Sequence, residues 1–233
     1  MTPFVSVLMP LYNSRQYIGA ALESVLDQTY RNFEIIVVDD GSTDEGARMV
    51  EAYPKVRLFR QEHGGISRAR NFALSMAGGE LIAFLDSDDL WVPEKLALQV
   101  DYLETHSECG IVFSRFRNFS DIPLNQMTQR QKELFAAEFT TYLPSACIRK
   151  SLFDRFGLFH EDCIFGEDTE WVARLRLARI DLGHCLEEEL YLRRVHGGNV
   201  TLTHPDMDES GKYSIMARAI REKWRRERIE TSL

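Results

Sequence analysis

The first hundred residues alternate short apolar runs with longer amphipathic segments, and this alternation limits the fold more than any other feature. Short apolar runs predict buried β-strands, and segments whose apolar side chains recur every three or four residues predict helices. Strands that are joined by helices run parallel and are linked by right-handed crossovers. The sequence therefore predicts an α/β fold with a mostly parallel central sheet flanked by helices. We expect strands at residues 4–9, 33–38, 56–59 and 80–85, and helices at 13–28, 43–52, 66–76 and from 93 onward. Asn13 or Ser14 is expected to cap the first helix, and Thr43 the second.

Two acidic clusters directly follow strands of this predicted sheet. Residues 39–44 read DDGSTD and follow the run IIVV, and residues 86–89 read DSDD and follow LIAFL. In α/β proteins, ligands bind in the crevice outside the carboxyl ends of the parallel strands. Carboxylates in contact repel each other by roughly 1 kcal/mol even in water, so a positive charge should offset them. We expect a divalent metal that carries a phosphorylated substrate.

The second half of the chain has a less regular pattern. We expect a strand at 110–119, a polar loop with a short helix at 121–141, a helix at 167–178 and a strand at 189–195. Irregular surface of this kind commonly carries substrate specificity. Since no repeat or low-complexity linker divides the chain, we expect one compact domain at 1–205, with a nucleotide-binding half at 1–100 and a less regular half at 101–205.

The remaining segment, 206–233, is expected to form a basic amphipathic helix. Between Lys212 and Arg228 there are seven Lys or Arg and two Glu, a local excess of +5 in a chain of net charge −8. Such a helix would lie on anionic lipid, pack on a partner, or fold back on the domain, and the sequence leaves these alternatives open. A homodimer is likewise left open.

Composition bounds the class of protein. The chain has 233 residues, of which 44% are hydrophobic, enough for one sizeable core. The net negative charge argues against general nucleic-acid binding. No run approaches the roughly 20 apolar residues of a membrane span, and the amino terminus lacks the pattern of a secretory leader, so we expect a cytoplasmic protein. The four cysteines lack the spacing of zinc or redox motifs and are expected to be reduced.

The residue types at the predicted strand ends suit a nucleotide. Asp39 or Asp40 would accept a hydrogen bond from the imide N–H of a pyrimidine, and the ring of Tyr12 would stack on the base. Asp86 and Asp88 stand two apart, which places both carboxylates on one side of an extended segment. For each feature taken alone the simpler interpretation is structural: a packed tyrosine, or a solvated acidic turn that caps the next helix.

The ordered set of motifs resembles glycosyltransferase family 2, whose members have the GT-A fold. The resemblance rests on PLYN at 10–13, DDGSTD at 39–44, Gly65 with ARN at 69–71, DSDD at 86–89, and GED at 166–168 with Trp171. It covers nearly the whole chain from Phe4 to about Thr201, and it implies a nucleotide-sugar-binding half at 1–100 and an acceptor and catalytic half at 101–205. Any one of these motifs is weak, whereas the set in this order is specific.

The resemblance implies metal-dependent transfer of a sugar from a nucleotide diphosphate, with inversion at the anomeric carbon. Tyr12 and Asp40 match positions that hold the base, with Pro10 and Asp39 beside them. Asp86 matches a carboxylate near the ribose or the donor sugar. The donor is expected to be a UDP-sugar, and the acceptor a glycan or a lipid-linked precursor of a cell-surface polysaccharide.

The resemblance also implies the metal ligand and the catalytic base. Asp88 matches the ligand of Mg²⁺ or Mn²⁺, hard ions that suit carboxylate and phosphate oxygens. Asp168 matches the general base, and a single carboxylate base suffices for one inverting displacement. The expected first helical turn would favour its charged, proton-accepting form. The structural alternative is that Glu167 and Asp168 only stabilise that helix.

Two further residues have open roles. His196 matches a region that folds over the donor in relatives, where a neutral imidazole would join the metal and a protonated one would meet phosphate. Arg70 would contact the diphosphate or instead brace the acidic crevice. Two other classes of protein also remain: a nucleotidyltransferase that makes the sugar nucleotide, and a scaffold that binds it without catalysis. The segment 10–15 contains no glycine, which counts against a triphosphate-binding loop.

Overall fold

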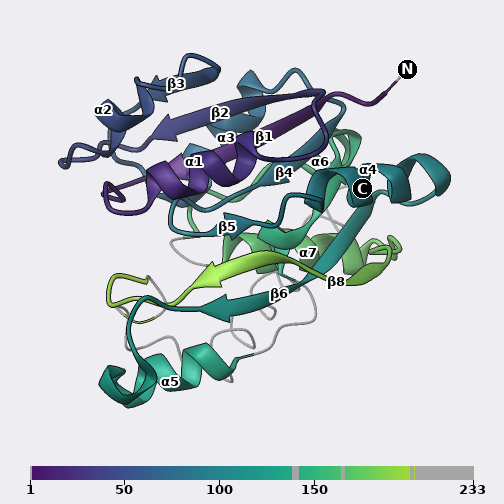
Figure 1. Cartoon of the computed structure of the whole chain (residues 1–233). Coiled ribbons are helices and arrows are strands. Elements are labelled where there is room, and N and C mark those ends of the chain that lie inside the picture. Colours follow the sequence, from purple (N-terminus) through teal and green to yellow (C-terminus); the bar gives the residue numbers. More distant parts are fainter. Residues whose placement is uncertain (1, 138–141, 164–165, 200–201, 203–233) are drawn as a thin grey trace.

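The structure is a computed structural model that describes residues 2–137, 142–163, 166–199 and 202. It contains an eight-stranded mixed sheet with helices packed against it (Figure 1). The strand order is β3-β2-β1-β4-β7-β6-β8-β5. The strands are β1 (Val5–Leu11), β2 (Phe33–Asp39), β3 (Val56–Arg60), β4 (Leu81–Phe84), β5 (Leu90–Trp91), β6 (Ile111–Phe119), β7 (Cys147–Arg149) and β8 (Cys185–Arg194).

Helices separate β1, β2, β3 and β4, as the alternating pattern predicts, whereas β5 follows β4 directly. Two short 3-10 turns, η1 (Leu124–Gln126) and η2 (Leu143–Ser145), lie in the second half. The α-helices are α1 (Ile18–Leu26), α2 (Gly46–Val50), α3 (Ile66–Met76), α4 (Lys95–Thr105), α5 (Gln129–Ala136), α6 (Ser151–Phe156) and α7 (Glu167–Leu177).

The first four strands form the parallel part of the sheet. β1 pairs in parallel with β2 and with β4, and β2 pairs in parallel with β3. Their carboxyl ends therefore meet at one edge, as predicted. The prediction of a mostly parallel sheet in an α/β domain is confirmed.

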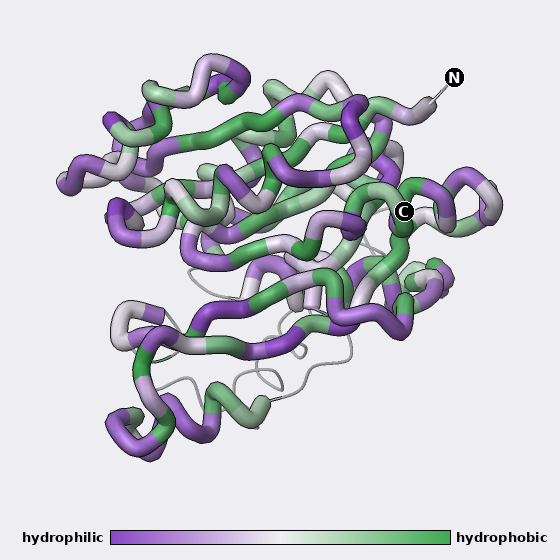
Figure 2. The backbone as a smooth tube through the Cα atoms, in the orientation of Figure 1, coloured by the Kyte–Doolittle hydropathy of each residue, from purple (hydrophilic) through white to green (hydrophobic). Residues whose placement is uncertain are grey.

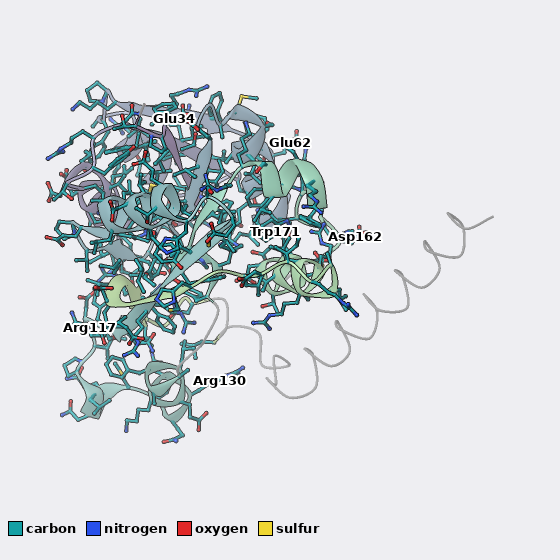
Figure 3. All side chains as sticks on the ribbon, turned by 90° about the vertical axis from the view of Figure 1, so that its right-hand side faces the viewer. Glu34, Glu62, Arg117, Arg130, Asp162 and Trp171 are labelled. Atoms are coloured by element: carbon teal, nitrogen blue, oxygen red, sulfur yellow. The ribbon has the colours of Figure 1, made fainter. Side chains whose placement is uncertain are left out.

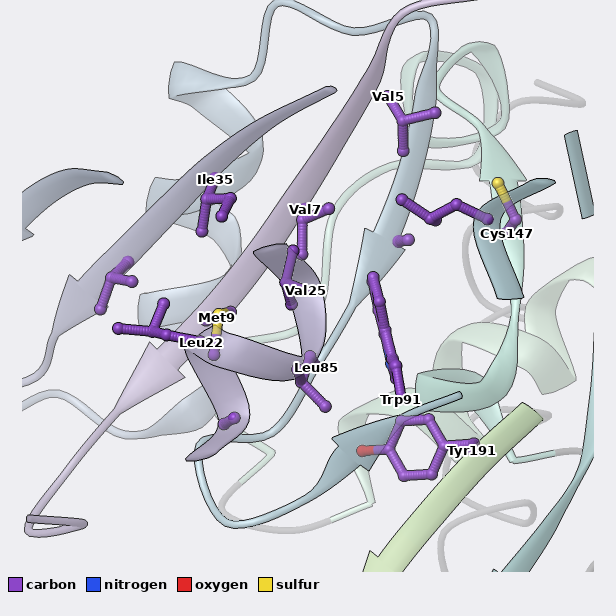
Figure 4. Packing of buried hydrophobic residues seen from close by; sticks show 14 of the residues in the cluster. Val5, Val7, Met9, Leu22, Val25, Ile35, Leu85, Trp91, Cys147 and Tyr191 are labelled. Atoms are coloured by element: carbon purple, nitrogen blue, oxygen red, sulfur yellow. The ribbon is translucent and has the colours of Figure 1, made fainter. Parts of the chain in front are cut away.

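The parallel part is buried on both faces, which explains its nearly continuous apolar runs. Alternate residues of β1 enter two separate cores: Val7 and Met9 pack with α1 on one side, and Leu8 packs with α3 on the other. Figure 2 shows mostly hydrophobic residues along the central strands and more hydrophilic residues in the loops. Figure 4 shows Leu22 and Val25 of α1 beside these β1 side chains. Full burial of each such side chain stabilises the fold by about 1.5–3 kcal/mol.

The second half continues the sheet in mixed directions. β7 is antiparallel to both β4 and β6, while β6 and β8 are parallel with register shifts around Arg115. β5 is antiparallel to the end of β8, with Leu90 opposite Leu192. This two-residue strand is too short for a periodicity to reveal it. It brings the end of β8 next to the segment that follows β4 (Figure 1).

Two helices begin later than the sequence pattern suggests, because their expected caps are used elsewhere. α1 begins at Ile18 rather than after Asn13 or Ser14. The side chain of Asn13 instead accepts the Thr43 backbone N–H at 2.8 Å and so ties two loops together. The Thr43 hydroxyl also donates to Asn13 Oδ1 at 3.2 Å, and Thr43 does not cap α2, which begins at Gly46.

The expected basic helix at 206–233 lies outside the described residues. Among the helices of the described segments, none is long and apolar enough to cross a membrane.

Candidate active site

The residues that end β1, β2 and β4 lie together at the carboxyl edge of the parallel strands. Leu11 pairs with Asp39 in the β1–β2 register, and the Asp40 N–H donates to the Leu11 carbonyl oxygen at 2.8 Å. The Leu85 N–H donates to the Leu8 carbonyl oxygen at 3.1 Å, so the segment after β4 leaves the sheet beside β1. The structure thus brings the two acidic clusters to the same edge.

Pro10 and Tyr12 stand on either side of the end of β1. Pro10 pairs with Val38 but lies beyond Leu8, the last β1 residue paired with β4, so its missing N–H costs no bond to β4. Tyr12 follows the strand and is 46% exposed. Its ring stacks on that of His63, with centroids 4.2 Å apart and planes 20° apart.

The Asp40 carboxylate is buried and holds the loop after β3. Its Oδ1 accepts from Gln61 Nε2 at 2.6 Å and from the Gly64 N–H at 2.9 Å. Its Oδ2 accepts from the Gly65 N–H at 2.8 Å and lies 2.9 Å from His63 Nδ1. A carboxylate has about four acceptor positions, and these four donors fill them.

Asp39 organises the loop that follows β2. Its Oδ1 accepts the Ser42 N–H at 3.0 Å, and its Oδ2 lies 3.9 Å from Arg60 Nε. Asn13, with a positive φ of 49°, donates its backbone N–H to Ser42 Oγ at 3.0 Å. The motifs PLYN and DDGSTD therefore hold each other in place, a structural role in addition to any contact with a nucleotide.

A buried arginine connects the cluster after β4 with helix α7. Arg70 Nη2 donates to Asp86 Oδ1 at 2.7 Å, and Arg70 Nη1 pairs with Glu167 Oε1. The guanidinium also lies over the rings of Phe84 and Phe159, 5.5 and 5.9 Å from their centroids. Arg70 is only 2% exposed, which fits the bracing alternative for this residue. Its contact with a diphosphate stays a prediction.

The bridge does not fully offset the negative charge around it. Burial raises the pKa of Glu167 to about 7, although Arg70 opposes the shift, and the charge of Asp168 raises it further. Burial also raises the pKa of Asp86, again against Arg70. The charge of Asp168 contributes to both shifts, so Asp168 is within electrostatic reach of Asp86.

Asp88 pairs with His196, a predicted site residue that lies 108 positions later in the chain. Asp88 Oδ2 lies 2.9 Å from His196 Nε2. The Gly198 N–H donates to His196 Nδ1 at 3.1 Å, which places the imidazole proton on Nε2, facing Asp88. The ring of Tyr17 packs against His196 with centroids 4.5 Å apart. Tyr17 is a further residue of the site that sequence reasoning did not select.

The Asp88–His196 pair fits two neighbouring ligands of an octahedral metal. At metal–ligand distances of about 2.1 Å, adjacent ligand atoms are about 3 Å apart, close to the observed separation. A metal on Nε2 would move the imidazole proton to Nδ1, and Gly198 would give up its hydrogen bond. In the described part of the chain, no three His, Cys, Asp or Glu side chains form a larger ligand cluster. Mg²⁺ sites are commonly completed by substrate phosphates and water.

Asp89 positions the end of β8, and sequence reasoning did not assign it this role. Its Oδ1 accepts the Arg194 N–H at 2.7 Å, and its Oδ2 accepts the Tyr191 hydroxyl at 2.7 Å. Burial raises the pKa of Asp89 well above its usual value, and the charges of Asp88 and Asp86 raise it further. The two hydrogen bonds hold the chain so that His196 reaches Asp88. The sequence signal that could have identified Asp89 is its place as the third aspartate of the DSDD cluster at 86–89.

Asp168 lies in the first turn of α7, as predicted. Gly166 precedes the helix in the left-handed conformation, with φ 71°, which favours glycine. Asp168 Oδ1 accepts the Thr169 N–H at 2.6 Å, and Asp168 is half-buried. Within the described residues its Oδ2 has no hydrogen bond. Three acidic residues in this turn interact favourably with the helix dipole.

A buried tryptophan anchors α7 and with it Asp168. Trp171 is fully buried and stacks on Phe153, with centroids 4.3 Å apart and planes 19° apart. Its Nε1 donates to the Gly157 carbonyl oxygen at 2.9 Å. Figure 3 shows Trp171 at the junction of the helix with the body of the domain. The start of α7 therefore has a rigid support.

The predicted site residues thus form two linked groups. Pro10, Tyr12, Asp39 and Asp40 lie at the ends of β1 and β2, and Arg70, Asp86, Asp88, Asp168 and His196 lie around the end of β4. A hydrogen bond of 2.8 Å from Ser87 Oγ to Ser14 Oγ joins the two groups.

A family model and similar relatives agree on one protein family. The family model described as "Glycosyl transferase family 2" matches residues 6–161. An uncharacterized glycosyltransferase of Rickettsia typhi is 31% identical over 216 residues, which are 87% of this chain and 67% of that protein. A Bacillus subtilis protein, TuaG, named as a teichuronic acid biosynthesis glycosyltransferase, is 37% identical over 145 residues, which are 60% of this chain and 56% of TuaG.

Solved structures share the fold. Residues 1–349 of S. aureus TarS in complex with UDP-GlcNAc match with a TM-score of 0.74 and 25% identity, over 93% of this chain and 65% of that one. The mannosyltransferase PcManGT of Pyrobaculum calidifontis, in complex with GDP-Man and Mn²⁺, matches with a TM-score of 0.64 and 23% identity, over 85% and 59%. The chain spans between about a third and two thirds of the length of the first curated relatives.

Proposed function

Because the chain belongs to glycosyl transferase family 2, we propose that it transfers a sugar from a nucleotide diphosphate to an acceptor hydroxyl with inversion at the anomeric carbon. The observation that carries this proposal is the Arg70 bridge, which fastens the start of α7 to Asp86 and so keeps Asp168 near the acidic turn after β4. Donor and acceptor would meet between these two carboxylates.

The donor site would use the ends of β1 and β2. Tyr12 offers an exposed aromatic ring for a base, with Pro10 and Asp39 beside it, and Asp40 offers a carboxylate that is held in place by two backbone N–H groups. We favour UDP as the nucleotide. TarS, which shares the fold, has been solved with UDP and with UDP-GlcNAc, and this likeness supports that choice. Asp86 would lie toward the ribose or the sugar.

A Mg²⁺ or Mn²⁺ ion would be held by Asp88 and His196, with donor phosphate and water completing its shell. When bound, it would neutralise the charge that develops on the departing diphosphate. Asp88 keeps about a quarter of its side chain exposed, and His196 less. That partial exposure leaves room for an ion to reach the pair from solvent.

Asp168 would act as the general base. Its carboxylate would take the proton from the acceptor hydroxyl as that oxygen forms a bond to the anomeric carbon. The bond between that carbon and the diphosphate oxygen would break, and the nucleoside diphosphate would leave with the electron pair. The buried, positively charged Arg70 between Asp86 and Glu167 would keep the base at a fixed distance from the donor.

The acceptor would be a growing surface glycan or its lipid-linked precursor. The relative named for teichuronic acid biosynthesis supports a cell-surface polymer. The basic segment 206–233 would suit an acceptor held at a membrane. Unchanged binding to anionic liposomes after deletion of residues 210–233 would remove this part of the proposal.

A donor screen tests the function. UDP-sugars and GDP-mannose are added with Mn²⁺, and the shift in melting temperature identifies a ligand, since it stabilises only the folded form. The donor that binds is then incubated with the protein, and the products are separated. Slow release of nucleoside diphosphate supports the transferase. A separate incubation with UTP and a sugar 1-phosphate tests the rival enzyme class, since release of pyrophosphate from these two substrates would indicate a nucleotidyltransferase. Tight donor binding with no product in either incubation would indicate a scaffold.

A further inference from the structure

The proposed base site is occupied by one of the chain's own side chains, His63. The imidazole stacks on Tyr12 at a centroid distance of 4.2 Å with planes 20° apart. Its Nδ1 lies 2.9 Å from Asp40 Oδ2 and 3.1 Å from the Asp40 carbonyl oxygen. Both of these partners are acceptors, so Nδ1 carries the proton. His63 is therefore a flat ring that stacks on Tyr12 and donates an N–H to Asp40.

These are the two contacts that a nucleobase would make at the same place. A pyrimidine would stack on Tyr12 and donate its imide N–H to Asp40. The Asp40 carboxylate already accepts from Gln61, Gly64 and Gly65. His63 fills its remaining acceptor position, and about four are available in total. A base N–H can reach Asp40 only by replacing one of these donors.

His63 is the donor best able to leave. Its side chain is 55% exposed, whereas Gln61 is half-buried and the Gly64 and Gly65 donors belong to the backbone of the loop. The backbone of His63 packs closely on Gly41, since a Cβ added to Gly41 would lie only 2.9 Å from the His63 nitrogen. Rotation of the exposed His63 side chain would free Asp40 without moving this packed backbone.

We propose that His63 stands in for the nucleobase in the nucleotide-free protein and that donor binding displaces it from Tyr12 and Asp40. This inference rests on the proposed function, since it takes Tyr12 and Asp40 as the base site. The internal ring keeps the buried carboxylate paired when no donor is present. It also lowers the apparent donor affinity, because only the fraction of molecules with His63 rotated away can bind.

Nucleotide binding by His63 variants tests the proposal. Titration of UDP in the presence of Mn²⁺ is followed by calorimetry for the wild type, His63→Ala and His63→Phe. His63→Ala should bind UDP about three- to tenfold more tightly, since the competing ring is gone. His63→Phe keeps a ring that can stack but loses the bond to Asp40, and its affinity should lie between the other two.

His106→Ala is the matched control. His106 also stacks on a tyrosine, Tyr102, with centroids 4.1 Å apart and planes 11° apart. It lies at the opposite edge of the sheet, since Arg149 contacts the adjoining Leu103 and Cys109 carbonyls and pairs with Leu81, the first residue of β4. UDP affinity should match the wild type in this variant.

Three outcomes overturn the proposal while the proposed function stands. Equal UDP affinity in His63→Ala would show that His63 does not compete, and weaker affinity would show that it helps to hold the base. A second measurement does not depend on a variant: the ring protons of His63, shifted upfield by Tyr12, should move downfield when UDP is added, and unchanged signals in the UDP complex would also overturn it. Absence of nucleotide binding in every variant and the wild type would remove the proposed function and this inference together.

Discussion

After β2, the carboxylates of Asp39 and Asp40 are occupied by donors from neighbouring loops, chiefly backbone N–H groups and Gln61. After β4, Asp86 relies on one shared arginine and Asp88 on one histidine, and the charge of Asp88 raises the pKa of Asp86. The two clusters have the same position relative to their strands. The first organises loops, whereas the second retains negative charge that a cation can offset.

The largest expected effect is a loss of sugar transfer when the carboxylate near the second acidic cluster, Asp168, is neutralised. Asp168→Asn removes the proposed base, since a neutral amide does not accept the acceptor's proton, and the transfer rate should fall about a hundredfold to ten-thousandfold. UDP affinity should be unchanged. Initial rates with the identified donor measure the transfer rate, and calorimetry measures the UDP affinity. Asp154→Asn, an exposed acid in the first turn of α6, is the control. Wild-type turnover in Asp168→Asn would exclude this residue as the base.

A second large effect should separate the two clusters by their need for metal. Asp88→Asn replaces a carboxylate ligand by a poorer amide, so Mn²⁺-dependent UDP binding should weaken by about a hundredfold. The free energy of unfolding without metal should not fall, because the charge of Asp88 raises the pKa values of Asp86 and Asp89. Calorimetry and urea unfolding measure the two effects, with the exposed Asp101→Asn on α4 as control. Normal Mn²⁺-dependent binding would rule out the ligand assignment.

The same Asp→Asn change in the cluster after β2 should lower the stability of the fold. Asp40→Asn turns an amide N–H₂ toward donors that need an acceptor, and the free energy of unfolding should fall by about 1–3 kcal/mol. Urea unfolding without nucleotide measures the change, side by side with Asp88→Asn. If both variants were equally stable, the contrast between a loop-organising cluster and a charge-retaining cluster would be lost.

The smallest expected effect is a change in pH dependence. Burial raises the pKa of Glu167 from 4.5 to about 7. The folded protein therefore binds this proton more tightly than the unfolded chain. The resulting stability is fully present below pH 4.5 and is lost as the pH rises through about 7. In Glu167→Gln the unfolding free energy should fall less steeply with pH over this window, by a slope that corresponds to at most one bound proton. The glutamine keeps an oxygen that can accept from Arg70. An unchanged slope would mean that Glu167 titrates normally.

Much of the fold was predictable because its signals are local. The apolar runs that became β1, β2 and β4 and the start of α7 depend on residues within a few positions of one another. The ordered motifs indicated the family, and the family model confirmed it. β5 escaped prediction because two residues carry no periodicity, and the start of α1 was misplaced because Asn13 caps nothing and binds Thr43 instead.

The sequence by itself determined the layers of the domain, the edge where the acids gather and the candidates for base and metal ligand. Only the tertiary structure decided how each acid is compensated, because that depends on partners far along the chain. Arg70 meets Glu167 across 97 residues, Asp88 meets His196 across 108, and His63 reaches Tyr12 only through a loop folded onto Asp40. Hydrogen bonds and shifted pKa values depend on distances of a few ångströms and on burial, and neither quantity exists until the chain has packed.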